Sequence, residues 1–216
     1  MKIALIGPTG FVGKAVLTEL LARGHTVTAI ARQTDGLPPH PNLQAIQADV
    51  RDTARLTNAL DDLQAVISAF NAGWDNPDIY KDFIAGSRAI VAATKAAGIK
   101  RYIVIGGAGS LHLPDGSQLV DAPDFPVAIR EGARAARDAL DELKRESTLD
   151  WTFLSPPVGF HPGGPQQRTG RYRTGGDQPL STGDGPGTIS AADLAVAVVD
   201  ELEKPQHIGQ RFTIAW

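Results

Sequence analysis

Three glycines near the start of the chain stand where a phosphate group could approach the backbone. Gly7, Gly10 and Gly13 are three residues apart, between the apolar run KIALI and a helical pattern. A strand, a glycine turn and a helix N-terminus together present backbone N–H groups to an anion such as the pyrophosphate of a dinucleotide. A tight turn that only packs a helix is the alternative. The position of the turn after the first strand favours the dinucleotide.

Two better-known phosphate motifs do not fit this turn. The fingerprint of ordinary dehydrogenases spaces its glycines two and then three residues apart. A P-loop needs a glycine five positions before its Gly-Lys pair and Ser or Thr after it, whereas Pro8 and Ala15 hold those positions here. The turn therefore predicts a phosphate site with a spacing of its own, made of Gly7, Pro8, Thr9, Gly10, Phe11, Val12 and Gly13.

Arg32 favours NADP(H) over NAD(H). An NAD-dependent enzyme usually carries an acid after its second strand, where the carboxylate accepts from the ribose 2′-hydroxyl. Here the strand HTVTAIA is followed by Arg32 and Gln33, with no acid. A guanidinium at this place offers charge-assisted hydrogen bonds to a 2′-phosphate. A solvated surface arginine is the alternative.

Candidate residues for contact with a substrate are few. Ser110 could donate to a substrate oxygen or only hold its loop, and His161 could protonate a substrate or be a bystander. Three aromatic side chains could stack on a flat acceptor or only pack: Trp74, Phe160 and Tyr172. A metal site has no support, because the chain has no cysteine and its 5 histidines show no paired ligand spacing.

The elements that would position these residues alternate between strand and helix. Strands are expected at KIALI, HTVTAIA, LQAIQA, AVISAF, RYIVIG, WTFLS and QRFTIAW, and helices at 11–23, 52–60, 78–97, 130–146 and from 190 to about 203. Near-continuous apolar strands that alternate with helices predict an α/β fold, a doubly wound parallel sheet of the Rossmann type. Its ligand crevice should lie at the carboxyl ends of the strands.

One domain is expected to span residues 1–216, with 156–187 as a lid or small C-terminal substrate-side lobe. That segment is rich in glycine and proline, and a hairpin is expected around Gly175-Gly176. Ser190 and Asp193 have the spacing of a capping box at the start of the last helix.

Composition narrows the kind of protein and its partners. The net charge of −3, with no basic run, gives no reason to expect nucleic acid as a partner. No apolar stretch approaches the roughly 20 residues of a membrane span, the N-terminus does not read as a signal peptide, and cysteine is absent. We expect a cytoplasmic protein with a small-molecule partner, and the choice between monomer and homodimer stays open.

Several stretches resemble the atypical short-chain dehydrogenase/reductases. Besides the glycine turn they are SAFNAG at 68–73, GIKRYIVIGGAGSL at 98–111, LDWTFLSPP at 149–157 and TISAADLAVAVVDELE at 188–203. Within that group, nearly the whole chain is similar to the small NAD(P)H-binding proteins grouped with biliverdin reductase B and the NmrA-like regulators.

The resemblance implies further contacts with the dinucleotide. Asp49 would meet the adenine amino group, with Val50 against the ring, although Asp49 could instead cap the following turn. The other implied contacts are Phe70, Asn71, Ala72, Gly73, Gly106, Gly107, Ala108, Pro156, Pro157 and Val158.

The chain departs from the superfamily where proton transfer is concerned. Typical members carry a Tyr-x-x-x-Lys pair, yet none of Tyr80, Tyr102 and Tyr172 has a lysine four residues later. We expect an NADPH-dependent reductase of a small planar or carbonyl acceptor, such as a flavin or quinone, which can take its proton from water. A non-catalytic NADP(H) sensor of the NmrA-like kind is the alternative. A sugar-type epimerase or dehydratase is less favoured because the Tyr-Lys pair is missing.

Overall fold

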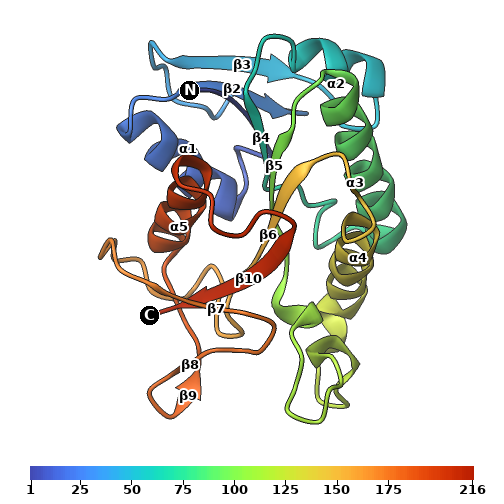
Figure 1. The fold of residues 1–216 in the computed structure, drawn as a ribbon, viewed down its shortest axis with the longest axis vertical. Coiled ribbons are helices and arrows are strands. Elements are labelled where there is room, and N and C mark those ends of the chain that lie inside the picture. The colour runs from blue at the N-terminus through green and yellow to red at the C-terminus, as the bar shows by residue number, and fades with distance from the viewer.

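An eight-stranded sheet forms the centre of the protein, whose residues 1–216 are described by a computed structural model (Figure 1). The strands lie in the order β3-β2-β1-β4-β5-β6-β10-β7. They are β1 (Lys2–Ile6), β2 (Thr26–Ala31), β3 (Leu43–Gln47), β4 (Ala65–Ser68), β5 (Arg101–Ile105), β6 (Asp150–Ser155), β7 (Arg173–Gly175) and β10 (Gln210–Ala215). Neighbouring strands pair in parallel except β7, which is antiparallel to β10. The predicted doubly wound sheet is confirmed.

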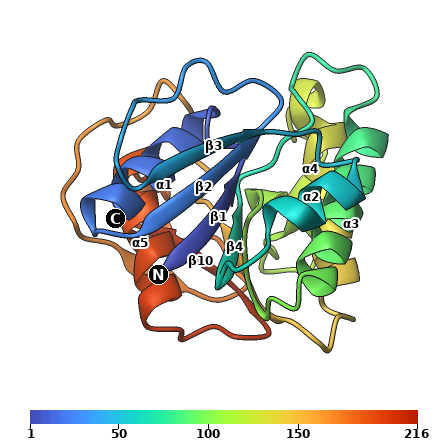
Figure 2. The same cartoon turned by 90° about the horizontal axis from the view of Figure 1, so that it is seen from above.

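Helices cover both faces of the sheet (Figure 2). α1 (Phe11–Ala22) and α5 (Ala191–Glu203) pack together on one face, and α2 (Thr53–Ala59), α3 (Ile79–Ala96) and α4 (Val127–Leu143) pack on the other. Each face has its own apolar core, one centred on α1 and α5 and the other on residues such as Ile90, Tyr102 and Phe153. Burial on both faces explains why the strands read as continuous apolar runs.

The strand order places the expected ligand crevice. β1 pairs with β2 on one side and with β4 on the other, and the helices that follow β1 and β4 cover opposite faces of the sheet. In such a sheet the loops that follow the strands separate at this point and leave a crevice at the carboxyl ends. The glycine turn follows β1, Arg32 follows β2 and Phe70 follows β4, so they lie along one edge.

Two local predictions need correction. The helix expected at 130–146 begins at Val127, because Pro126 takes the N-cap position, where a missing N–H costs nothing. The hairpin expected around Gly175-Gly176 is wrong: residues 173–175 are β7 and pair with β10, and the hairpin is formed by β8 (Ser181–Thr182) and β9 (Gly185–Pro186). No helix of this fold combines the length and the apolarity that a membrane crossing needs.

Candidate dinucleotide site

Each of the three glycines in the first turn is needed for a different structural reason. Gly7 has φ +79°, a left-handed conformation that favours glycine, and a Cβ there would lie 2.6 Å from the carbonyl oxygen of Ala69. A Cβ on Gly13 would lie 1.9 Å from the carbonyl oxygen of Gly7, so helix α1 can start only if this position has no side chain. Gly10 has an ordinary φ of −74° and its Cβ would meet nothing nearer than 3.6 Å. Gly10 therefore keeps space open, as a site for a ligand requires.

Helix α1 begins at this open position without a capping side chain. Gly10 is the N-cap residue and makes no side-chain cap hydrogen bond, and the first turn of α1 contains no acidic residue. The first N–H groups of the helix therefore point their partial positive charge into the crevice. Thr9 and Gly10 are exposed, whereas Pro8 is buried beneath them. This arrangement fits the two phosphates of a dinucleotide.

A cleft of about 610 Å³ opens beside the turn, along the ends of β1, β2, β3 and β4. Of the residues expected to bind the cofactor, it brings together Gly7, Thr9, Gly10, Arg32, Asp49, Val50, Phe70, Asn71 and Ala72. Its lining also includes Gln33, Gln47, Arg51 and Asp82, which the sequence analysis missed. The remaining expected contacts lie outside this cleft.

Arg32 and Arg51 place two cations on the cleft at the ends of β2 and β3. Both side chains are exposed, and the guanidinium of Arg32 forms no hydrogen bond or ion pair within the protein. Arg51 instead bonds Asp49, with Nη2 3.0 Å from Oδ2, and these bonds hold the pKa of Asp49 below its usual range. The position of Arg51, two residues after Asp49, was the signal that could have revealed it.

Asn71 and Phe70 shape the cleft after β4. The side-chain oxygen of Asn71 accepts from the N–H of Gly73 at 2.7 Å, which fixes the turn, and Gly73 has φ +104°. The ring of Phe70 lies over helix α3 where a Cβ on Gly86 would be only 2.4 Å away. Phe70 and Val50 thus offer apolar surface within the cleft, next to a polar rim.

The ends of β5 and β6 continue the same edge beyond the cleft. Gly106 has no room for a side chain, because a Cβ there would lie 1.9 Å from the ring of Phe153. Gly107 is extended, and Ala108 starts a short 3-10 helix over 108–110. After β6, Pro156 and Pro157 are buried while Val158 is 41% exposed. These backbone-lined ends adjoin β4, where the second half of a dinucleotide would lie.

Ser110 is enclosed rather than presented to a ligand. Its side chain is buried, and its hydroxyl lies 3.4 Å from Nη1 of Arg211, which also reaches Ser155 at 3.5 Å. Nε of Arg211 donates to Asp177 at 2.6 Å. This geometry favours the loop-holding alternative, because Ser110 helps to surround a buried guanidinium that ties segment 156–187 to the loop after β5.

The remaining candidates are scattered. Trp74 is 57% exposed and lies over Gly132 of α4, at the carboxyl end of the sheet. Phe160 packs in a tilted arrangement against Phe11 at the start of α1, with ring centroids 5.3 Å apart, and His161 beside it is exposed. Tyr172 packs against the core of the α1 and α5 face, as Phe160 does, and its hydroxyl donates to Asp200 at 2.7 Å.

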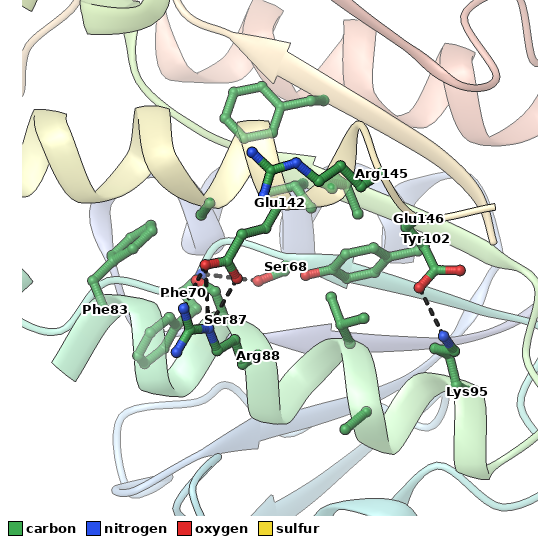
Figure 3. Close-up of a pocket in the computed structure, with 16 residues that line it drawn as sticks. Ser68, Phe70, Phe83, Ser87, Arg88, Lys95, Tyr102, Glu142, Arg145 and Glu146 are labelled. Atoms are coloured by element: carbon green, nitrogen blue, oxygen red, sulfur yellow. Dashed lines mark hydrogen bonds and ion pairs between the residues drawn. The ribbon is translucent and has the colours of Figure 1, made fainter. Parts of the chain in front are cut away.

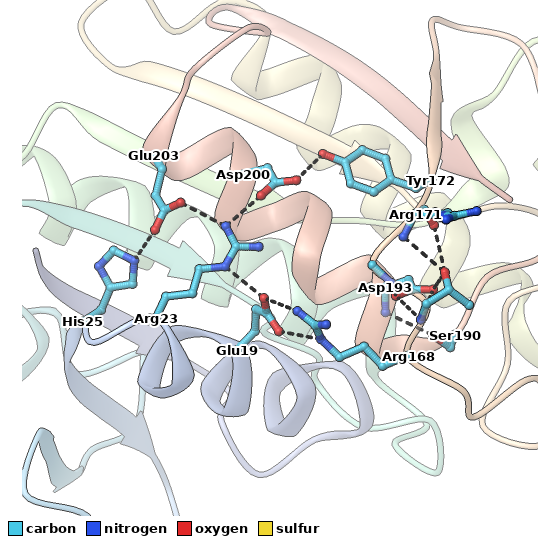
Figure 4. A network of polar contacts seen from close by, with 12 residues as sticks. Glu19, Arg23, His25, Arg168, Arg171, Tyr172, Ser190, Asp193, Asp200 and Glu203 are labelled. Carbon is cyan, nitrogen blue, oxygen red and sulfur yellow. Dashed lines mark hydrogen bonds and ion pairs between the residues drawn. The ribbon is translucent and has the colours of Figure 1, made fainter.

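Figure 4 shows how segment 156–187 is tied to α1 and α5. Nη2 of Arg168 donates to Glu19 at 2.9 Å, and the buried carboxylate of Asp193 accepts from the N–H groups of Thr169 and Gly170. Burial opposes the charge of Asp193, but these hydrogen bonds outweigh it and hold its pKa below the usual range. Ser190 caps α5 as predicted, whereas the carboxylate of Asp193 does not complete the capping box, because it binds this segment instead.

No phenol is left to transfer a proton at the carboxyl ends of the strands. The hydroxyl of Tyr80 donates to Asp138 at 2.6 Å, and that of Tyr172 is used by Asp200. Tyr102 is fully buried in the core under α3 and α4, and burial raises the pKa of its hydroxyl well above the usual range. The site therefore has features that fit a dinucleotide but no Tyr-Lys pair.

Comparison with known proteins decides the family, because a family model described as NAD(P)H-binding matches residues 7–205. The chain belongs to this NAD(P)H-binding family. The YwnB protein of Bacillus subtilis is 36% identical over 217 residues, which covers 99% of this chain and 98% of YwnB. The likeness to NAD(P)H-binding proteins predicted from the sequence is thus confirmed, and so is a nicotinamide dinucleotide as the cofactor class.

Two solved structures are similar to this chain over its whole length. A "putative epimerase" of Bacteroides thetaiotaomicron has a TM-score of 0.91 and 39% identity, covering 100% of this chain and 96% of that one. A "putative NADH-flavin reductase" of Streptococcus pneumoniae has a TM-score of 0.85 and 36% identity, covering 100% and 99%. The names of these two relatives give different reactions. The family therefore indicates the class of cofactor, and the reaction has to be inferred from the residues of the site.

Proposed function

We propose that this protein is an NADPH-dependent reductase of a small planar or carbonyl acceptor, of the flavin or quinone kind. The observation that carries the NADPH preference is the unpaired guanidinium of Arg32 on the cleft, where NAD-dependent enzymes carry an acid. Arg51 adds a second cation beside it. Asp49 does not take the role of that acid, because its carboxylate already accepts from Arg51.

Different residues of the cleft would bind different parts of NADPH. The N–H groups at the start of α1 would receive the pyrophosphate, and Arg32 would receive the 2′-phosphate through charge-assisted hydrogen bonds. Val50 and Phe70 would pack against the adenine, while Gly106, Gly107 and Ala108 would let the nicotinamide approach the backbone. When bound, NADPH supplies a hydride from its nicotinamide ring.

The acceptor class follows from the missing tyrosine proton donor. A ketone that becomes an alcohol needs a proton at its oxygen, and a positioned phenol usually provides it. In this protein the tyrosines are engaged or buried and Ser110 faces Arg211. A flavin or quinone can take its proton from water, so the protein needs only to hold it. Trp74, exposed over α4, offers a flat apolar surface for such a ring.

The name of the streptococcal relative, "putative NADH-flavin reductase", supports a flavin as the acceptor class, although it gives NADH rather than NADPH as the donor. We place the reaction in the cytoplasm, with no nucleic acid or membrane partner, and propose no oligomeric state. An epimerase is less favoured despite the name of the Bacteroides relative, because transient oxidation of a sugar also needs a base and an acid.

A non-catalytic NADP(H) sensor is the second candidate. The same missing proton relay favours it, because a sensor needs binding without chemistry. A sensor should distinguish NADP⁺ from NADPH or bind a protein partner, and should consume no NADPH with any acceptor.

Turnover with a panel of acceptors separates the two. NADPH consumption is followed with flavins, quinones and simple carbonyls as acceptors. We expect consumption with at least one flavin or quinone and little with simple ketones, which would need a donated proton. Tight NADPH binding with no consumption across the panel would overturn the reductase proposal and leave the sensor.

A further inference from the structure

A second cavity lies between helices α3 and α4, on the face of the sheet opposite α1 and α5 (Figure 3). Its volume is about 430 Å³, within the usual range of small-molecule sites. The floor is made by residues of β4, β5 and β6, and the walls by helices α3 and α4 and the residues that follow α4. Apart from Phe70, none of its lining residues lines the dinucleotide cleft.

Small side chains on the facing helices leave this space open. Ser87 and Ala92 of α3 and Ala139 of α4 line it where larger residues would close the gap between the helices. Aromatic rings of Phe70, Phe83 and Tyr102 form much of the wall, and Phe70 and Phe83 lie 5.7 Å apart between ring centroids. Such walls suit a flat, apolar molecule.

Polar groups at the floor could orient that molecule. The hydroxyl of Tyr102 points toward Ser68 in the middle of the cavity (Figure 3) and is kept protonated by its burial. Ser68 Oγ accepts a long 3.4 Å hydrogen bond from the N–H of Phe70, and its hydroxyl also lies within hydrogen-bonding reach of the Tyr102 hydroxyl. The floor thus offers a phenol donor and a serine hydroxyl to one polar atom of a ligand.

Charges at the mouth give the preferred sign of that ligand. Two ion pairs cross the mouth from α3, Arg88 to Glu142 of α4 at 2.6 Å and Lys95 to Glu146, just after α4, at 2.7 Å. Arg145 lies on the same rim, exposed and in no ion pair. The rim therefore carries three cations against two carboxylates, and the remaining positive charge favours an anionic group on the bound molecule.

We propose that this cavity is a second ligand site, for a flat aromatic molecule with a single carboxylate. The ring system lies among Phe70, Phe83 and Tyr102, and the carboxylate lies at the mouth beside Arg145. Because Phe70 is shared with the dinucleotide cleft, occupation of the cavity restrains a wall of that cleft and couples the affinities of the two sites. The site itself does not depend on the reductase activity.

Binding of a fluorescent aromatic anion tests the site without any turnover. The probe is 1-anilinonaphthalene-8-sulfonate, with 2-naphthoate as the competing carboxylate, both titrated in the presence of saturating NADPH so that the dinucleotide cleft is closed to them. We expect saturable binding that 2-naphthoate displaces. Arg145→Glu should weaken the probe by about tenfold, because an attraction becomes a repulsion.

Two further variants make the result specific. Lys144→Glu makes the same charge change at a neighbouring exposed side chain, which pairs with Asp141 and does not line the cavity. The affinity of this variant for the probe should stay within about twofold of the wild type. Ala139→Phe fills the space and should abolish binding with an unchanged far-ultraviolet circular dichroism spectrum. Equal affinities for the two charge variants, or full binding to a folded Ala139→Phe variant, would overturn the proposal. So would a complete lack of probe binding to the wild type.

Discussion

Substitution of the glycines at positions 10 and 13 should separate binding from folding. The backbone of Gly10 has an ordinary φ of −74°, and a Cβ added there would meet no atom nearer than 3.6 Å. A side chain at this position would therefore fit the fold and occupy the space where the phosphates would lie. A side chain at Gly13 would lie 1.9 Å from the carbonyl oxygen of Gly7. We expect Gly10→Val to fold without binding NADPH, and Gly13→Ala to be damaged in its fold.

The magnitudes follow from these contacts. Loss of two hydrogen bonds to a charged phosphate, at about 1.5–3 kcal/mol each, weakens NADPH binding by roughly 100-fold or more in Gly10→Val. The change of an N-cap residue costs this variant about 1 kcal/mol, a fall in Tm of about 2–4 °C. Overpacking in Gly13→Ala costs about 3 kcal/mol, a fall in Tm of about 6–12 °C.

Two measurements check this contrast. Thermal unfolding followed by circular dichroism gives Tm for both variants, and titration with NADPH followed by intrinsic fluorescence gives the affinity. If Gly10→Val kept its fold and bound NADPH within about threefold of the wild type, the phosphates could not lie at this turn. Equal losses of Tm at both positions would refute the different roles assigned to the two glycines.

Three other substitutions test neighbouring parts of the account. Arg32→Glu should reverse the preference from NADPH toward NADH, with roughly 10-fold to 100-fold weaker NADPH binding. The control Arg55→Glu, at an exposed arginine outside the cleft, should change the preference little. Unchanged selectivity in Arg32→Glu would disprove the 2′-phosphate contact. Ser110→Ala should keep kcat/KM within about threefold, because its hydroxyl faces Arg211, and a loss above about 100-fold in steady-state kinetics would restore a catalytic role. Asp193→Ala should lower Tm by about 6 °C or more through its lost hydrogen bonds, whereas Asp184→Ala in the exposed hairpin should not. Since the folded pKa of Asp193 is lowered, its contribution to stability is present at neutral pH and is lost as the pH falls below about 4; equal acid sensitivity of the wild type and Asp193→Ala would contradict this.

The order of elements could be predicted from the sequence because local signals and packing agree. The run KIALI is strand β1 as expected, and the helices expected at 11–23 and 78–97 are followed by Gly24 and Gly98, whose φ of +77° and +72° suit glycine after a helix end. Asp52 caps α2 by accepting from the N–H of Arg55 at 3.0 Å. These features depend on neighbours in the chain, which a sequence shows directly.

The partners of polar side chains could not be predicted in the same way. Asp193 has the spacing of a capping box, but its carboxylate binds Thr169 and Trp216, which lie 24 and 23 residues away along the chain. Tyr172 could have stacked on a substrate, yet an acceptor on α5 takes its hydroxyl. Arg51 lines the cleft because β3 ends beside β2. Each of these outcomes depends on contacts made only when the sheet is assembled.

The ratio of kcat/KM for NADPH to that for NADH tests the central claim most directly. It is measured on the wild type with whichever flavin or quinone responds in the acceptor panel. An unpaired Arg32 and a neighbouring Arg51 on the cleft predict a ratio of about 10 or more in favour of NADPH. A ratio near one, or a preference for NADH, would contradict the account, because the arginines would then have no 2′-phosphate to bind.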